Sequence, residues 1–207
     1  MIALDPFRLV FLIGNLLYLY LLLGPPRRRS PHGQATDRRE TLLGLLLNFI
    51  GFFSQQLLPL VYILTPWLSE ADYSLGGSRL VNLRIAIQGF GCLTFALSLW
   101  LLWRAHIELG QSWSGGVDIG EAHTLVTDGL YRVVRHPIYA AFWLWGFAQL
   151  LMLPNWVVGL AGMLGHMPNY FYRIPREEQM LLDHYGEAYQ EYMHSTPRIL
   201  PRLGGKR

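Results

Sequence analysis

The chain has 207 residues, of which 52% are hydrophobic and 15% are charged, and it carries a formal net charge of +3 at pH 7. Soluble domains carry about 25% charged residues, so this composition argues against a water-soluble globular protein. The arginines stand beside apolar segments, where the preference for positive charge on the cytoplasmic side of a membrane explains them, so nucleic acid is not an expected partner.

Three apolar runs in the first half of the chain are long enough to cross a bilayer, which takes about 20 residues. They cover residues 7–24, 42–64 and 80–103. The arginine cluster at 27–29 follows the first run instead of preceding it, which predicts an uncleaved anchor with its N-terminus outside. The second helix then returns outward and the third comes back in, ending at Arg104.

The last apolar stretch, residues 138–165, is too long for one helix and contains Pro154-Asn155 near its middle. Proline removes a backbone donor and asparagine tolerates tight turns, so the stretch is predicted to be a helical hairpin. We expect its helices to extend from Pro137 to about Arg173. The predicted fold is therefore all-α: a polytopic integral membrane protein with five transmembrane helices, its N-terminus outside and its C-terminus in the cytoplasm.

The chemistry is expected in the second half of one integrated membrane domain. Residues 1–104 supply three transmembrane helices, and residues 105–207 supply a cytoplasmic loop, the hairpin and a C-terminal amphipathic helix. The connection over residues 104–136 is far longer than the median of about 4 to 6 residues. Its apolar side chains favour a loop that folds back onto the membrane surface.

Polar residues inside the apolar runs have two explanations. One face of the second helix carries small and amide residues at steps of four, three and four: Gly44, Asn48, Gly51 and Gln55. Such a face predicts a seam where two helices pack closely. His166 and Pro168 interrupt the last apolar run. The proline is expected to kink the helix, and the histidine either packs against a neighbouring helix or touches a ligand.

The densest cluster of reactive side chains lies at residues 128–139. Pro137 is suited to the first turn of a helix, which places Arg135 and His136 at a helix N-terminus on the cytoplasmic face. Backbone donors and positive potential at that position favour a carboxylate, so the anionic group of a ligand would fit there. The alternative is that Arg135 only marks the membrane boundary and His136 only caps the helix.

A second cluster, residues 173–178, opens an amphipathic segment that runs to about His194. Adjacent glutamates in a first helical turn, here Glu177 and Glu178, are ordinarily explained by the helix macrodipole. The hairpin, however, would bring them to the same membrane face as the arginine and histidine at 135–136. A site with both signs suits a zwitterion, because a carboxylate pairs with arginine and an ammonium or sulfonium pairs with glutamate.

Other kinds of site lack their sequence patterns. The single cysteine, Cys92, lies within an apolar run, which leaves no thiolate metal site, and no histidine pair has metal-ligand spacing. The serines have no nucleophile elbow around them. The glycines of the long loop do not form the phosphate-binding fingerprint of a nucleotide-binding sheet.

Three features in this order resemble the isoprenylcysteine carboxyl methyltransferase family, especially its prokaryotic five-helix members. They are Arg-His-Pro-Ile-Tyr at 135–139, the predicted hairpin, and Arg-Ile-Pro-Arg-Glu-Glu at 173–178, within a resemblance that covers about residues 109–203. The resemblance implies an integral membrane enzyme with a cytoplasmic active site. It would use S-adenosylmethionine and release S-adenosylhomocysteine, without a Rossmann domain.

The resemblance also implies roles for individual residues. The cofactor-binding positions are His123, Leu125, Val126, Gly129, Tyr131, Arg135, His136, Pro137, Tyr139, Glu177 and Glu178. From the mechanism of methyl transfer we expect the catalytic positions to be Arg173, which would orient the acceptor, and Glu178; either Glu178 or His136 would assist proton removal if the acceptor were a thiol or an amine. No metal ion is expected at the site.

We therefore expect methyl transfer from S-adenosylmethionine to a lipophilic acceptor that enters from the bilayer, either a small molecule or a prenylated protein. Transfer is an in-line displacement by a nucleophile held about 3 to 3.5 Å away, and a carboxylate is already ionised at pH 7 and needs no base. This favours isoprenylcysteine-type O-methylation. The alternatives are methylation of a phospholipid amine or a thiol, and a non-catalytic carrier or assembly subunit whose charges only anchor helix ends.

Overall fold

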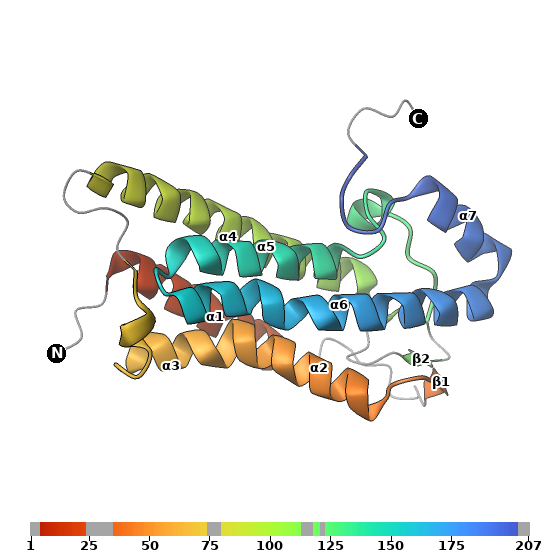
Figure 1. Cartoon of the computed structure of the whole chain (residues 1–207). Helices are drawn as coiled ribbons and strands as arrows, with labels where there is room; N and C mark the ends of the chain where they lie inside the picture. Colours follow the sequence, from red (N-terminus) through yellow and green to blue (C-terminus); the bar gives the residue numbers. More distant parts are fainter. Residues whose placement is uncertain (1–4, 24–34, 74–79, 113–117, 121–122, 203–207) are drawn as a thin grey trace.

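The computed structural model describes residues 5–23, 35–73, 80–112, 118–120 and 123–202, and its longest helices run roughly along one common direction (Figure 1). The helices are α1 (Pro6–Leu23), α2 (Leu42–Phe52), α3 (Leu58–Leu64), α4 (Val81–Leu109), α5 (Pro137–Met152), α6 (Trp156–Tyr185) and α7 (Glu187–Ser195). Shorter helical turns are η1 (Phe53–Leu57), η2 (Ser69–Ala71), η4 (Gly110–Ser112) and η5 (Gly129–Arg132). The prediction of an all-α fold is confirmed for this part of the chain.

Two short strands are an addition that the sequence did not predict. β1 (Ala35–Arg38) and β2 (Asp118–Gly120) pair antiparallel and so join the loop after α4 to the segment before α2. The arginine cluster at 27–29, from which the orientation of the first helix is predicted, lies outside the described residues. The third helix is longer than predicted, because it continues past Arg104, whose ion pair with Glu108 at 2.8 Å supports the last turns of α4.

The predicted second span, 42–64, is a single helical path with a π-helical turn, η1, between α2 and α3. Pro59 lacks an N–H, and in a regular helix its ring would clash with the carbonyl four residues earlier, so the wider turn relieves the conflict. The carbonyls of Gln55 and Gln56 accept the side-chain amide of Asn15 at 3.4 Å. The turn therefore links α2 to α1 inside the bundle.

The packing seam predicted on this helix is confirmed for Asn48, Gly51 and Gln55, whereas Gly44 lies against Glu40, just before α2. Gly51 lies against the ring of His166, and a Cβ built on Gly51 would come 3.4 Å from its Nδ1. Gln55 donates from its amide to the carbonyl of Gly162 at 2.9 Å. Asn169 of α6 donates to the side-chain oxygen of Asn48 at 2.9 Å. Small residues and amides thus hold α2 against α6.

The predicted hairpin is confirmed as α5, a turn at Pro154-Asn155, and α6. The side chain of Asn155 accepts from the backbone N–H of Val158 at 2.9 Å and so caps α6. Two details differ from the prediction. The helix is not interrupted at Pro168, and no separate amphipathic helix begins at Arg173, because α6 packs along α5 and α2 and continues through both of its prolines. The break comes at Gly186, whose positive φ of 56° separates α6 from α7.

The bundle core lies where α1, α4 and α5 meet. The rings of Phe11 and Phe95 stack with centroids 4.7 Å apart, and Trp145 meets Phe95 edge-on at 4.8 Å. Outward-facing positions of the same bundle are also apolar, among them Leu45, Leu46 and Phe49 on α2 and Phe90, Leu93 and Leu97 on α4. An exposed apolar surface of this kind fits contact with lipid.

By length and composition, two helices in the described part of the chain can cross a membrane, Leu42–Leu64 and Val81–Leu109. Pro6–Tyr20 and Pro137–Met152 are apolar but shorter. The predicted count of five spans is not reached by this criterion and stays a prediction.

Candidate functional site

A cavity of about 430 Å³ lies between the loop that precedes α5, the middle of α6, and α2 with η1. Most of the residues predicted to bind a cofactor or acceptor line it: His123, Leu125, Val126, Tyr131, Arg135, His136, Pro137, Tyr139, Arg173 and Glu177. Two predicted residues, Gly129 and Glu178, are not part of its lining. Segments far apart in the sequence therefore meet at one cavity.

Glu178 is the centre of a buried ionic cluster beside the cavity. The residue is 4% exposed, and its carboxylate accepts a hydrogen bond from Nη2 of Arg135 at 2.7 Å. Nε2 of His136 lies 3.2 Å from the same carboxylate oxygen. Arg198, from the segment after α7, donates from Nε to both oxygens at 3.1 and 3.0 Å. The cluster ties the start of α5, the last third of α6 and the C-terminal segment together.

This environment keeps Glu178 ionised at neutral pH. Burial alone would raise the pKa of its carboxyl group, but hydrogen bonds from His136, Arg198 and Arg135 outweigh burial and lower the pKa from 4.5 to about 2. Both of its oxygens already accept hydrogen bonds from these donors. Glu178 is therefore a fixed negative charge and a poor proton acceptor.

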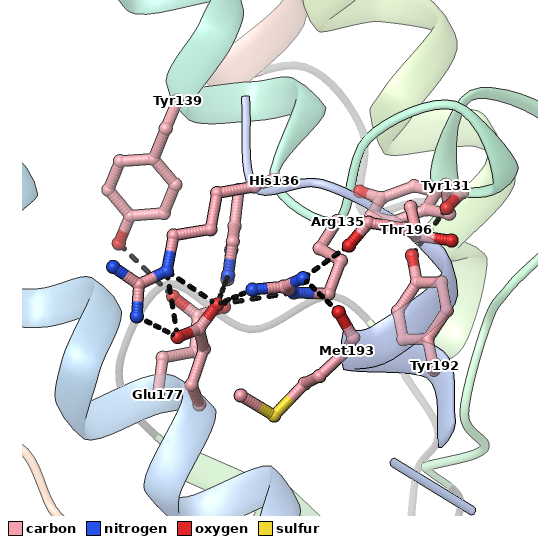
Figure 2. A network of polar contacts seen from close by, with 10 residues as sticks. Tyr131, Arg135, His136, Tyr139, Glu177, Tyr192, Met193 and Thr196 are labelled. Carbon is pink, nitrogen blue, oxygen red and sulfur yellow. Dashed lines mark hydrogen bonds and ion pairs between the residues drawn. The ribbon is translucent and has the colours of Figure 1, made fainter. Parts of the chain in front are cut away.

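Arg135 is largely occupied by protein acceptors, although it lines the cavity. Its Nε and Nη2 donate to Glu178, and its Nη1 donates to the backbone carbonyls of Met193 and Thr196 (Figure 2). A guanidinium has five N–H groups, so these contacts leave at most one for a ligand. The backbone N–H groups of residues 135 and 136 donate to the carbonyls of Pro197 and Arg198 at 2.8 Å, which completes the attachment of the C-terminal segment.

Glu177, the neighbour of Glu178, faces the cavity. Its carboxylate accepts a hydrogen bond at Oε2 from the hydroxyl of Tyr139 at 3.2 Å. In Figure 2, Tyr139 of α5 lies over Glu177 of α6. This carboxylate can accept a further hydrogen bond or pair with a cation from a ligand.

Arg173 lies about one turn before the glutamates on α6 and also lines the cavity, with a residue exposure of 6%. Its Nη2 is 3.4 Å from the carboxylate of Glu40, which belongs to the segment between β1 and α2. Its Nε has no hydrogen-bond partner among the described residues. Arg173 is therefore a buried cation with an N–H available to a ligand.

Gly129 shapes the loop and does not line the cavity. Its φ of +61° favours glycine, and a Cβ at this position would come 2.5 Å from the carboxylate of Glu108. That carboxylate accepts the backbone N–H of Leu130 at 2.7 Å. The turn therefore fastens the predicted binding loop to the end of α4.

Three residues important to this arrangement were missed by sequence reasoning: Glu40, Glu108 and Arg198. Arg198 stands in the Pro-Arg-Ile-Leu-Pro stretch at 197–201, which falls inside the resemblance, so a role could have been sought for it. Glu40 and Glu108 stand alone among neutral or basic neighbours, and nothing in their local pattern names their partners. Among the described residues, no group of three or more His, Cys, Asp or Glu side chains is placed to hold a metal ion.

Residues 90–183, which include α5 and the glutamate pair, match the sequence profile of the isoprenylcysteine carboxyl methyltransferase (ICMT) family. The matched segment is a little under half of the chain, so it shows a similarity to the ICMT family over these residues. The family is one of integral membrane proteins, and the long apolar helices of this chain agree with that similarity.

Curated ICMT enzymes are similar over part of their length. Protein-S-isoprenylcysteine O-methyltransferase of Schizosaccharomyces pombe is 33% identical over 129 residues, which is 61% of this chain and 55% of that protein. Protein-S-isoprenylcysteine O-methyltransferase B of Arabidopsis thaliana is 33% identical over 117 residues, 56% of this chain and 59% of that protein. The chain thus matches a little over half the length of these relatives.

A solved structure of the eukaryotic intramembrane Ras methyltransferase ICMT has a similar fold. It superposes with a TM-score of 0.53 at 19% identity, and the match covers 96% of this chain and 75% of that one. At this identity the likeness concerns the fold. It extends the similarity beyond residues 90–183 to nearly the whole helical bundle.

Proposed function

We propose that this protein belongs to the ICMT family and transfers a methyl group from S-adenosylmethionine to a carboxylate on a lipophilic acceptor. One observation carries the proposal: a single cavity joins a charged end, with Glu177 and Arg173, to an inner part between α2, α5 and α6. A polar cofactor and an apolar acceptor can meet in such a cavity without either leaving its own environment.

The charged end of the cavity fits the amino acid part of the cofactor. Glu177 can pair with the ammonium group. The hydroxyls of Tyr131 and Tyr189 are buried, line the same cavity and have no hydrogen-bond partner among the described residues, so they can donate to the cofactor's oxygens. When bound, the cofactor supplies a sulfonium that makes its methyl group electrophilic.

The acceptor carboxylate is assigned to Arg173. Its unpartnered Nε–H can donate a hydrogen bond to an oxygen of the acceptor carboxylate, and the positive charge of the guanidinium favours an anion. Glu40 holds the other side of the guanidinium and so fixes its direction. Because a carboxylate is ionised at neutral pH, the protein has to position the acceptor and exclude water, and it has no proton to remove.

Glu178 is assigned a structural role instead of the catalytic and cofactor-binding roles expected from the sequence. Its carboxylate already has five donor nitrogens around it, from Arg135, His136 and Arg198, and its pKa of about 2 makes it a weak base. Methylation of a phospholipid amine or a thiol requires proton removal. The geometry therefore favours a carboxylate acceptor over those alternatives.

We further propose five membrane crossings, by α1, the α2–α3 helix, α4, α5 and the first part of α6, with the site on the cytoplasmic side. At 1.5 Å per residue, the 30 residues of α6 extend about 45 Å, which exceeds the roughly 30 Å hydrocarbon thickness, so its last turns lie outside the bilayer. Arginines are frequent at this end, including Arg132, Arg176 and Arg202. At the other end, Arg8 and Arg84 are neutralised by Asp72 and Asp5 at 3.3 Å.

The experiment is methyl transfer by detergent-purified protein from labelled S-adenosylmethionine to N-acetyl-S-farnesylcysteine. The controls are the same compound with its carboxyl group converted to an amide, and phosphatidylethanolamine. We expect a labelled, base-labile ester only from the free acid. Label on the amide or on the phospholipid, with none on the acid, would overturn the proposal of a carboxylate acceptor.

A further inference from the structure

Beyond its charged end, the cavity continues between α2, α5 and α6 and meets a row of polar side chains on one face of α6. The row consists of His166, Asn169, Arg173 and Glu177, at steps of three, four and four, and all four residues line the cavity. His166 is ten residues from the start of α6 at Trp156, which is about 15 Å along the helix and near mid-depth of the bilayer.

Three members of this row have buried polar atoms without partners. Nε2 of His166, Oδ1 of Asn169 and Nε of Arg173 make no hydrogen bond among the described residues, and the three residues are only 4%, 5% and 6% exposed. A buried polar group left without a partner costs about 1–3 kcal/mol. Three in one row along a cavity wall indicate that the ligand of this cavity supplies polar atoms at more than one depth.

Aromatic rings surround His166, so this part of the cavity suits an apolar ligand group that carries one polar atom. Its ring centroid lies 4.9 Å from that of Phe142, 6.0 Å from that of Tyr139 and 6.4 Å from that of Trp143. The amide of Gln55, which also lines the cavity, already donates to the carbonyls of Phe142 and Gly162 at 2.9 Å, and Asn48 accepts from Asn169 at 2.9 Å. Gln56 also lines the cavity and has an unpartnered Oε1, but it stands on η1; on the α6 wall, His166 and Asn169 are the side chains left to recognise a polar atom of the acceptor.

The helix geometry sets how far this polar atom lies from the reacting carboxylate. With Arg173 holding the carboxylate, Asn169 is about 6 Å and His166 about 10 Å deeper along the helix axis. A plain hydrocarbon chain passing this level would leave both side chains unpaired.

We infer that the acceptor is an oxygenated lipophilic acid: besides its carboxylate, it carries a hydroxyl on its apolar body, which donates to Oδ1 of Asn169 and lies against Nε2 of His166. The inference rests on the proposed function, since it names the kind of acceptor for the same site. It makes His166 a specificity-determining residue that contacts the acceptor away from the reacting atoms.

The test compares two acceptors of equal length, N-acetyl-S-decylcysteine and its analogue with a hydroxyl on the fourth carbon of the decyl chain. We expect kcat/KM to be higher for the hydroxylated acid by roughly tenfold or more, because a site built for a hydroxyl rejects the analogue that lacks it. His166→Phe, which keeps the ring volume, should remove the preference, and His166→Gln, which keeps a hydrogen-bonding group, should restore part of it. Affinity for S-adenosylhomocysteine should be unchanged in both variants.

Equal kcat/KM for the two acids in the native protein, or an unchanged preference in His166→Phe, would overturn the inference. The second result would reduce His166 to a packing residue against Gly51. If neither acid is methylated although S-adenosylhomocysteine binds, the carboxylate acceptor of the proposed function is wrong and the inference falls with it. Failure of the inference alone is therefore distinguishable, because methylation then occurs without a preference.

Discussion

Glu177 and Glu178 are adjacent in the sequence, yet their carboxylates lie in different surroundings. Glu177 lines the cavity and accepts a hydrogen bond from Tyr139 at 3.2 Å, whereas Glu178 is 4% exposed and is held by Arg135, His136 and Arg198. Successive residues on a helix point about 100° apart, which is enough to send one side chain into the cavity and the other into the ionic cluster beside it. The pair offers a matched comparison between ligand binding and structure.

The first prediction concerns stability. Glu178→Gln removes the negative charge that faces Arg135 and Arg198, and breaking a buried ion pair costs about 3–5 kcal/mol. We expect a clearly lower Tm in detergent, with the C-terminal segment more accessible to protease. Glu177→Gln, one residue away, should leave Tm nearly unchanged. Equal shifts in the two variants would contradict the division of roles.

The second prediction concerns pH. The pKa of Glu178 is lowered in the folded state to about 2, so its contribution to stability is fully present above the unfolded value of 4.5 and is lost as pH falls toward the folded value. The stability difference between the native protein and Glu178→Gln should therefore stay constant above about pH 5 and shrink below it. Denaturant unfolding followed at several pH values measures this difference, and a gap that widens on acidification would refute the assignment.

The third prediction concerns the cofactor. Glu177→Gln should weaken the binding of S-adenosylhomocysteine by about tenfold or more, equivalent to roughly 1.4 kcal/mol, because the amide lacks the charge that pairs with the ligand's ammonium group. Glu187→Gln, at an exposed position in the first turn of α7, is the control and should bind normally. An unchanged affinity of Glu177→Gln for S-adenosylhomocysteine would mean that another side chain binds the ammonium group.

The fourth prediction concerns the acceptor. Arg173→Gln should raise KM for an acid acceptor by about tenfold or more while the affinity for S-adenosylhomocysteine is retained. Glu40→Gln should act in the same direction and more weakly, since it only loosens the direction of the guanidinium. Arg176→Gln is the control, because Arg176 is exposed and lies over the ring of Tyr172. Steady-state kinetics on all three variants separates these outcomes.

The features that the sequence predicts correctly have local causes. Pro154-Asn155 predicts the turn of the hairpin and Pro137 the start of α5, because proline and asparagine act on the backbone next to them. The steps from Asn48 to Gln55 predict the packing seam, because helical periodicity decides which residues share a face. The meeting of Arg135 and His136 with the glutamates then follows from the hairpin.

The features that it misses depend on distant partners. Arg198 reaches Glu178, and Glu40 reaches Arg173, only through tertiary packing, which no local pattern records. The same packing keeps α6 helical through Pro168 and Pro175, where local rules predict an end or a kink. The saturated hydrogen bonding of Glu178 is a consequence of these contacts, so its structural role could not be separated from that of Glu177 by sequence.

The most direct measurement is a calorimetric titration of S-adenosylhomocysteine into detergent-purified, folded protein. The proposed function predicts saturable binding at one site in the micromolar range, weakened by about tenfold in Glu177→Gln and retained in Arg173→Gln. Absence of binding heat at high micromolar ligand, with circular dichroism showing intact helices, would contradict the claim that this cavity holds the methyl donor.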